Sequence, residues 1–353
     1  MTRSRIGWGQ TAIVLALARI FSEAANFPSD DINYGMQRFT VIVLSYLLLG
    51  VTLVPLYIAM ERNGGAVYKS RTGAVAASLY LILAGITTAT RLQFYSSSTV
   101  LSAAPPWVII LFVSLVCLYG IFKGVPATLR TGVITAAGFL VLLITVIIGV
   151  SREIRPDYLY PALAERPSAL LTEVLTEYSK NAEAVIFASL CPMIRTRRRR
   201  SLLLALGLSL AALLLMTFLY NTVLGEYLNV TNFPFYALSS LSDISVLQRL
   251  DGIDVTVWTM TAVIKLTLIM LSVYVLAENA FNSRKTAYIS ACSALGITTL
   301  AAFFFSVNTN DFLRFSAVME TGIPLAVAAA AVPLSELIIS GKRSHNEKII
   351  KSS

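Results

Sequence analysis

The feature that most constrains this chain is a succession of apolar segments, each about as long as a helix must be to cross a bilayer. A transmembrane helix needs roughly 20 mainly apolar residues. Ten such segments lie near residues 8–28, 39–60, 73–96, 106–122, 131–150, 168–194, 201–222, 253–277, 286–307 and 312–338. Charged residues make up 13% of the chain, whereas they make up about a quarter of a soluble domain. The sequence therefore predicts an all-α polytopic membrane protein with about ten transmembrane helices.

The basic residues predict how these helices are oriented. If the N-terminus is cytoplasmic, eighteen of the 28 basic residues lie in cytoplasmic segments. Five lie in outside loops, namely Arg38, Arg152, Arg155, Arg166 and Arg249. Because cytoplasmic loops are enriched in Lys and Arg, we predict that both termini are cytoplasmic and that residues 342–353 form a disordered cytoplasmic tail. The net charge of +9 is then a topology signal, and no nucleic-acid partner is expected.

Charged residues interrupt the sixth segment, 168–194, at a depth where a membrane helix should hold none. They are Glu173, Glu177, Lys180 and Glu183, and Lys180 belongs to a trio that favours helix poorly, Ser179, Lys180 and Asn181. A charge at this depth costs several kcal/mol unless it is paired or hydrated. The stretch therefore predicts a functional break in this helix.

The first segment shows a similar pattern. Arg19 and Glu23 are four residues apart, so they share a helical face and can form an ion pair, or they can simply neutralise each other between helices. Ser22, Asn26 and Pro28 weaken the helix beside this pair.

The first and sixth segments are separated by four others, which is the arrangement expected of an inverted repeat of five plus five helices. We therefore predict a LeuT-like transporter fold within a single transmembrane domain, 1–341, with repeats near 8–150 and 168–338. In such folds the first helix of each half is broken near the midplane, and the break holds a small polar ligand and its coupling ion.

Three further charges lie within predicted spans. Lys265 is about halfway along the eighth segment with no carboxylate within one turn, so its partner must come from another span. The carboxylates of the first and sixth segments are the candidates, Glu23 and Glu177 among them. The alternative is that Lys265 only locks helices together. Arg91 and Arg314 either reach the same depth or extend to the outer headgroups.

Two other stretches predict local structure. Glu320, Gly322 and Pro324 indicate either an irregular helix or a simple kink in the tenth segment. The outside loop 225–252 has apolar residues among serines and acids, which predicts a short amphipathic helix at the interface.

Catalysis has little support in this sequence. The one histidine, His345, lies in the predicted tail, and no phosphate-binding glycine loop is present. The three cysteines, Cys117, Cys191 and Cys292, all lie within apolar segments. We therefore expect no enzyme, no cofactor and no metal site.

The region 233–274 resembles a known family. Its order is an aromatic residue and proline at Phe233 and Pro234, then Gln248, Arg249, Leu250 and Asp251, then Trp258, Ile264, Lys265 and Tyr274. This order resembles the permease-like B subunits of endospore germinant receptors, which belong to the amino acid-polyamine-organocation superfamily. The first segment departs from that superfamily because Ser22, Glu23 and Ala24 stand where a glycine-rich break is common.

The resemblance implies a sensor of small nutrients, typically amino acids, in the inner membrane of a spore. It also implies partners, namely a partly cytoplasmic A subunit and a lipoprotein C subunit. An amino-acid or organic-cation permease of the same fold is the first alternative, and a structural scaffold for partner subunits is the second.

The candidate binding residues bring both signs of charge to one depth, as the carboxylate and ammonium of an amino acid require. They are Arg19, Ser22, Glu23, Arg91, Glu177, Ser179, Lys180, Asn181 and Lys265. Lys265 is further expected to place its ammonium where sodium-coupled relatives of this fold hold an ion.

Overall fold

The computed structural model describes residues 6–24, 35–99, 104–159, 167–194, 196–229, 231–242 and 251–338. Within these ranges the chain is helical, and its β-type contact is an isolated parallel bridge between Ile6 and Ile194. The predicted all-α class is confirmed. The predicted helix-weakening residues Asn26 and Pro28 and the predicted tail 342–353 lie outside the described residues.

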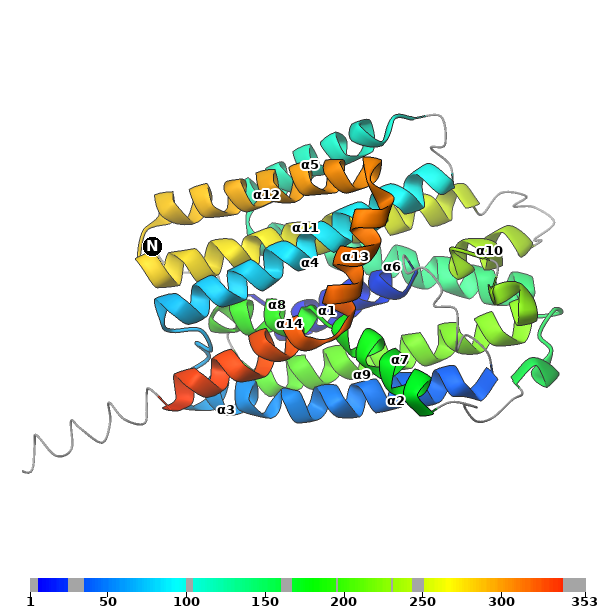
Figure 1. The fold of residues 1–353 in the computed structure, drawn as a ribbon, viewed down its shortest axis with the longest axis horizontal. Helices are drawn as coiled ribbons and strands as arrows, with labels where there is room; N and C mark the ends of the chain where they lie inside the picture. Colours follow the sequence, from blue (N-terminus) through cyan, green and yellow to red (C-terminus); the bar gives the residue numbers. More distant parts are fainter. Residues whose placement is uncertain are drawn as a thin grey trace, which may run out of the picture.

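The helices follow one another as α1 (Trp8–Ala24), α2 (Gly35–Thr52), α3 (Val54–Arg62), α4 (Arg71–Ser98), α5 (Pro106–Lys123), α6 (Val125–Val150), α7 (Pro167–Ser179), α8 (Glu183–Leu190), α9 (Arg198–Leu219), α10 (Pro234–Leu241), α11 (Asp251–Phe281), α12 (Arg284–Val307), α13 (Thr309–Glu320) and α14 (Ile323–Ala326). Short 3-10 or π segments are η1 (Pro156–Leu159), η2 (Cys191–Met193), η3 (Tyr220–Leu224), η4 (Gly225–Asn229) and η5 (Val327–Ala331). Figure 1 shows most of the long helices side by side along the long axis, with α13 running across them.

Seven of the described helices are long and apolar enough to cross a membrane, and the bent pair Thr309–Glu320 and Ile323–Ile338 would be an eighth. The predicted spans one and six are not among these. Span one corresponds to α1, which has 17 residues, and span six is divided into the shorter helices α7 and α8. The protein is therefore a multi-pass membrane protein. The number of described helices that are long and apolar enough to span the membrane is smaller than the predicted ten.

Large apolar side chains cover the outer faces of several helices. Phe112 of α5 is 64% exposed, Ile134 of α6 is 73% exposed and Leu300 of α12 is 71% exposed. A continuous apolar surface of this kind is unfavourable in water and favourable against lipid tails. These faces are the ones that the bilayer covers.

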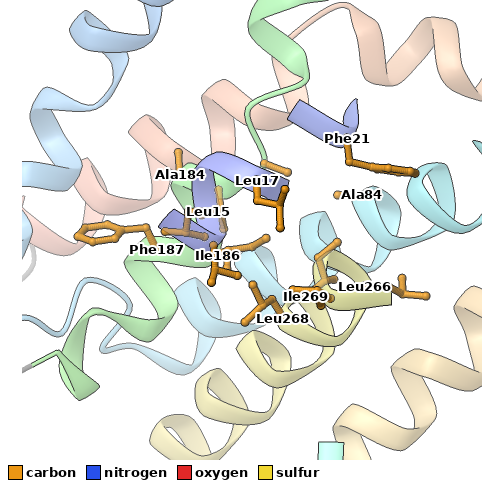
Figure 2. Close-up of a cluster of buried hydrophobic side chains, with 14 of the residues drawn as sticks. Leu15, Leu17, Phe21, Ala84, Ala184, Ile186, Phe187, Leu266, Leu268 and Ile269 are labelled. Atoms are coloured by element: carbon orange, nitrogen blue, oxygen red, sulfur yellow. The ribbon is translucent and has the colours of Figure 1, made fainter. Parts of the chain in front are cut away.

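At the centre of the bundle, α11 packs against α4, α5, α6 and α12. Its close approach to α5 depends on Gly120, because a Cβ there would lie 2.6 Å from Cγ2 of Thr267. Figure 2 shows the apolar side chains that fill the space between α1, α4, α8 and α11. They include Leu15, Leu17, Phe21, Ala84, Ile186, Phe187, Leu268 and Ile269. This packing excludes water from the helices that carry the charged residues.

The helix predicted in the loop 225–252 is α10. Its residues Phe235 and Leu238 are buried, whereas Leu241 is exposed. The ring of Phe235 meets that of Trp258 in α11 edge to face, with 5.3 Å between ring centroids. The short helix is confirmed, and its apolar side packs onto the bundle.

Candidate ligand-binding site

The break between α7 and α8 is stabilised by a side chain within it. The Asn181 side-chain amide donates hydrogen bonds to the backbone carbonyls of Glu177, at 3.2 Å, and Tyr178, at 3.0 Å. Carbonyls in the last turn of a helix lack their usual donors, so a side-chain amide at this point favours the end of α7. The break predicted from Ser179, Lys180 and Asn181 is confirmed.

Glu177, in the last turn of α7, is the centre of a buried ion network. Its side chain is 0% exposed and pairs with three cations from three elements. Arg19 pairs with Oε1, and Oε2 lies 2.7 Å from Arg38 Nη2 and 2.9 Å from Lys180 Nζ. Glu23 is a second carboxylate of this network, 2.7 Å from Arg38 and 3.1 Å from Lys180. The network joins α1, α2 and α7 through ion pairs.

Arg38 had been predicted in an outside loop, and that prediction is wrong. The helix α2 begins at Gly35, so Arg38 lies in its first turn, where its side chain is 11% exposed. It also approaches Glu173, at 3.6 Å. The signal that could have found it is its position directly before the apolar segment 39–60, because a charge there lies at the edge of the hydrocarbon and requires a partner.

The predicted pairing of Arg19 with Glu23 along one helix is also wrong. Arg19 pairs with Glu177 and donates a hydrogen bond from Nε to Oδ1 of Asn181, at 3.1 Å. Glu23 pairs instead with Arg38 and Lys180. Inter-helix pairs prevail because α2 packs against α7, so that Glu177 and Arg38 from these two helices reach the two charged side chains of α1.

Lys265 of α11 pairs with a carboxylate of span six, as predicted, although not with Glu177. Its Nζ lies 2.7 Å from Glu183 Oε1 at the start of α8. The same ammonium donates hydrogen bonds to the hydroxyl of Ser22 and, at 3.3 Å, to the backbone carbonyl of Ala18. A partner from span six is therefore confirmed, whereas Glu23 and Glu177 are replaced in this role by Glu183.

A small cavity of about 50 Å³ lies beside these networks. Five of the nine predicted site residues line it, namely Ser22, Arg91, Ser179, Lys180 and Lys265. The rest of its wall consists of Phe21, Tyr80, Ala84, Thr87, Thr88, Ala182, Met319 and Glu320. Such a cavity has room for a few water-sized groups. Of the other four predicted residues, Glu23 and Glu177 pair with Lys180 of the cavity wall. Arg19 and Asn181 bond to Glu177 and to each other.

Arg91 reaches this cavity rather than the outer headgroups. Its side chain is 11% exposed, and its Nη2 lies 2.8 Å from Glu320 Oε1 and 3.2 Å from the hydroxyl of Ser316. The alternative that Arg91 extends to the headgroups is wrong, whereas Arg314 is exposed. Sequence reasoning did not include Glu320 among the site residues, although it marked the irregular stretch to which Glu320 belongs.

A family model described as spore germination protein matches residues 73–312 of this chain. The match covers well over half of the sequence. The chain belongs to the spore germination protein family. No curated protein matches it.

The fold of this spore germination protein is similar to that of a solved Na⁺-coupled sialic acid symporter in a substrate-bound, outward-open state. The TM-score is 0.62 at 11% sequence identity, and the match covers 92% of this chain and 78% of the symporter chain. The predicted LeuT-like transporter fold is confirmed, and so is the resemblance to the permease-like subunits.

The family match covers only part of the candidate site in this spore germination protein. Arg91, Glu177, Lys180 and Lys265 lie within residues 73–312, whereas the residues of α1 and Glu320 lie outside them. The site is therefore assembled from the matched region and from the two ends of the described bundle.

The cavity offers ionic and hydrogen-bonding groups to a ligand. Its wall carries the cations Arg91, Lys180 and Lys265 and the carboxylate Glu320, together with the hydroxyls of serine and threonine side chains. Among the described residues, no group of three His, Cys, Asp or Glu side chains is placed to hold a metal ion. The groups in this wall can form ionic and hydrogen-bonding contacts with a small polar molecule.

Proposed function

We propose that this chain is the membrane subunit of a spore germinant receptor and that it binds a small zwitterionic nutrient, such as an amino acid. The ligand binds in the cavity between α1, α4, the break after α7, α11 and α13. A-type and C-type receptor subunits are its partners, and binding triggers germination through them. The protein lies in the spore inner membrane with both termini in the cytoplasm.

The observation that carries this proposal is the cavity at the break of span six, with charges of both signs in its wall. Lys180 within the break and Lys265 on α11 contribute positive charge, and Glu320 contributes negative charge. In the hydrocarbon region, polar backbone is tolerated where it lines a cavity, and charged groups there mark ligand pathways. The family membership supports the same function.

The direct test is a germination assay in spores that carry Lys180→Ala. We expect loss of the nutrient response at a normal level of membrane protein, because Lys180 lines the cavity and its pairs with Glu23 and Glu177 hold the break in place. The matched control is Lys285→Ala, which removes an exposed lysine of α12. A normal response from the Lys180 variant would contradict the proposed site.

An amino-acid or organic-cation permease is the second candidate, favoured by the structural likeness to a symporter. A permease must open the same cavity to both sides of the membrane, whereas a sensor needs only to change conformation when the ligand binds. Purified protein in vesicles separates the two. Saturable uptake of labelled amino acids by this chain alone supports the permease, and binding without uptake supports the sensor.

We further propose that the ammonium of Lys265 takes the place of a coupling sodium ion. Its three acceptors are a carboxylate, a hydroxyl and a backbone carbonyl, which are the oxygen ligands that hard cations prefer. The wild-type protein should then bind its ligand equally well in sodium and in choline buffers. A sodium requirement for binding would show that Lys265 only joins helices.

The orientation is tested separately by labelling a cysteine introduced at Asn229 or Ser344. The partition of basic residues predicts labelling of Asn229→Cys from outside and of Ser344→Cys from the cytoplasm. Labelling of the Asn229 variant from the cytoplasmic side alone would reverse the proposed topology.

A further inference from the structure

The cations that line the cavity differ in how fully the protein already pairs them. Lys180 lies within 3.1 Å of two carboxylates, those of Glu23 and Glu177. Lys265 has Glu183 at 2.7 Å and two neutral acceptors in α1. A ligand carboxylate could recruit either ammonium only by disturbing several buried contacts at once, which is costly where water is excluded.

Arg91 is paired less completely. It has one carboxylate partner, Glu320, and one hydroxyl partner, Ser316. Its Nε is buried and has no hydrogen-bond partner among the described residues. Because a guanidinium carries five N–H donors in a planar fork, Arg91 retains donors for an incoming carboxylate.

Glu320 lines the cavity, and solvent reaches it more easily than it reaches the carboxylates of the neighbouring ion networks. Its side chain is 30% exposed, compared with 0% for Glu177 and 9% for Glu183. It is the last residue of α13, directly before a bend of 46° in span ten. At that bend Gly322 has φ +75°, and a Cβ there would lie 2.8 Å from Cδ1 of Tyr178. The bend therefore rests against α7, next to the break in span six.

We infer that Arg91 and Glu320 are the residues that read the two charges of the ligand, an inference that rests on the proposed function. Arg91 binds the ligand carboxylate, and Glu320 binds the ligand ammonium. Two ionic contacts to the ligand replace the single contact between Arg91 and Glu320.

This arrangement determines which molecules are accepted. A zwitterion satisfies both Arg91 and Glu320 when it separates them. A molecule with only a carboxylate leaves Glu320 without a cation, and one with only an amine leaves Arg91 without an anion. Leaving one of these partly buried charges unpaired weakens binding by about 10-fold.

The arrangement also connects binding with movement. The ion pair fastens the end of α13 to α4, and Ser316 adds a hydrogen bond of 2.7 Å to Glu320 within α13. A ligand inserted between Arg91 and Glu320 moves them apart, and the bend at Gly322 provides a place where span ten can yield. Its effect on the conformational equilibrium is limited by its preference for the separated state.

The test uses the purified full-length protein and begins with the twenty protein amino acids, screened by thermal stabilisation of the wild type. The amino acid that binds most tightly is then compared with its deaminated acid and its decarboxylated amine, in wild type, Glu320→Gln and Arg91→Gln. The wild type should prefer the zwitterion to both analogues. Glu320→Gln should lose the preference over the acid alone, and Arg91→Gln should lose the preference over the amine alone.

The controls separate recognition from folding. Glu278→Gln and Arg284→Gln break an exposed pair of the same residue types and should leave both preferences unchanged. Glu320→Asp and Arg91→Lys keep the charges and should retain both preferences. They are measured in place of a glutamine variant that fails to fold. Equal loss of both preferences in each glutamine variant, or no loss in either, would overturn the inference. Failure of all twenty amino acids to bind the wild type would instead overturn the proposed function.

Discussion

Two groups of charged side chains meet at the cavity, and they differ in how completely the protein neutralises them. The network around Glu177 is buried, and that one carboxylate pairs with three cations. The pair formed by Arg91 and Glu320 has a single ionic contact, and Glu320 is 30% exposed. The saturated network is suited to holding the helices, whereas the sparse pair retains capacity for a ligand. Depth in the membrane alone does not make a charged residue a binding residue.

The largest expected effect follows from changing the centre of the saturated network. Glu177→Gln leaves Arg19, Arg38 and Lys180 without their shared carboxylate in a site closed to water. Breaking a buried ionic arrangement from one side costs about 3 to 5 kcal/mol. Denaturant titration of the purified protein in detergent measures this loss. Glu173→Gln is the matched control, because Glu173 makes only a contact of 3.6 Å with Arg38.

The second effect concerns Lys265, whose pairing is intermediate between the two groups. Lys265→Met should lower the free energy of unfolding by about 3 kcal/mol, because Glu183 then remains buried without a cation. The double variant Lys265→Met with Glu183→Gln should recover most of that loss. Additive losses in the double-mutant cycle would show that the two residues do not depend on each other.

The third effect concerns Arg91, for which we expect a small change in stability and a clear loss of ligand binding. Arg91→Gln should lower the free energy of unfolding by only about 1 kcal/mol, because its partner Glu320 is reached by solvent. The same substitution should nevertheless weaken amino-acid binding. Unfolding and binding measured on the same preparation give the comparison, and a destabilisation as large as that of Glu177→Gln would place Arg91 in the structural group.

The smallest effect is expected at the pair of Glu278 and Arg284, which are 3.5 Å apart, because the Arg284 side chain is 55% exposed while Glu278 is 21% exposed. Glu278→Gln should change the free energy of unfolding by less than about 1 kcal/mol, since exposed ion pairs contribute little. A measurable change in ligand binding in this variant would mean that a charge far from the cavity also affects binding. The difference between the Glu177 network and the pair of Arg91 and Glu320 would then not explain ligand recognition.

Local features of the site could be read directly from the sequence. The trio Ser179, Lys180 and Asn181 predicted the break in span six because poor helix formers act on their own turn of the chain. The depth of Lys265 in its segment predicted that it needed a partner, because that cost depends only on distance along an apolar helix. The apolar segments predicted the helical class for the same local reason.

The identity of the ionic partners could not be read in this way. Arg38, Glu183 and Glu320 pair with residues that are far away along the chain, and each candidate carboxylate was locally equivalent. Arg19 and Glu23 show the difficulty most clearly, because their helical spacing allowed a pair that the neighbouring helices replaced. Buried charges combine according to packing geometry rather than sequence separation.

The sequence by itself determined that this protein spans a membrane and that its sixth span is broken near Lys180. It also determined which charged residues need a partner in the membrane. Hydropathy and helix propensity are properties of short stretches of sequence, so they can be predicted without knowledge of the tertiary contacts. Only the tertiary structure decided that Glu177 is enclosed by three cations while Glu320 stays within reach of solvent. Burial and pairing depend on which helices pack together, and that is settled by contacts between residues that the chain brings together only when it folds.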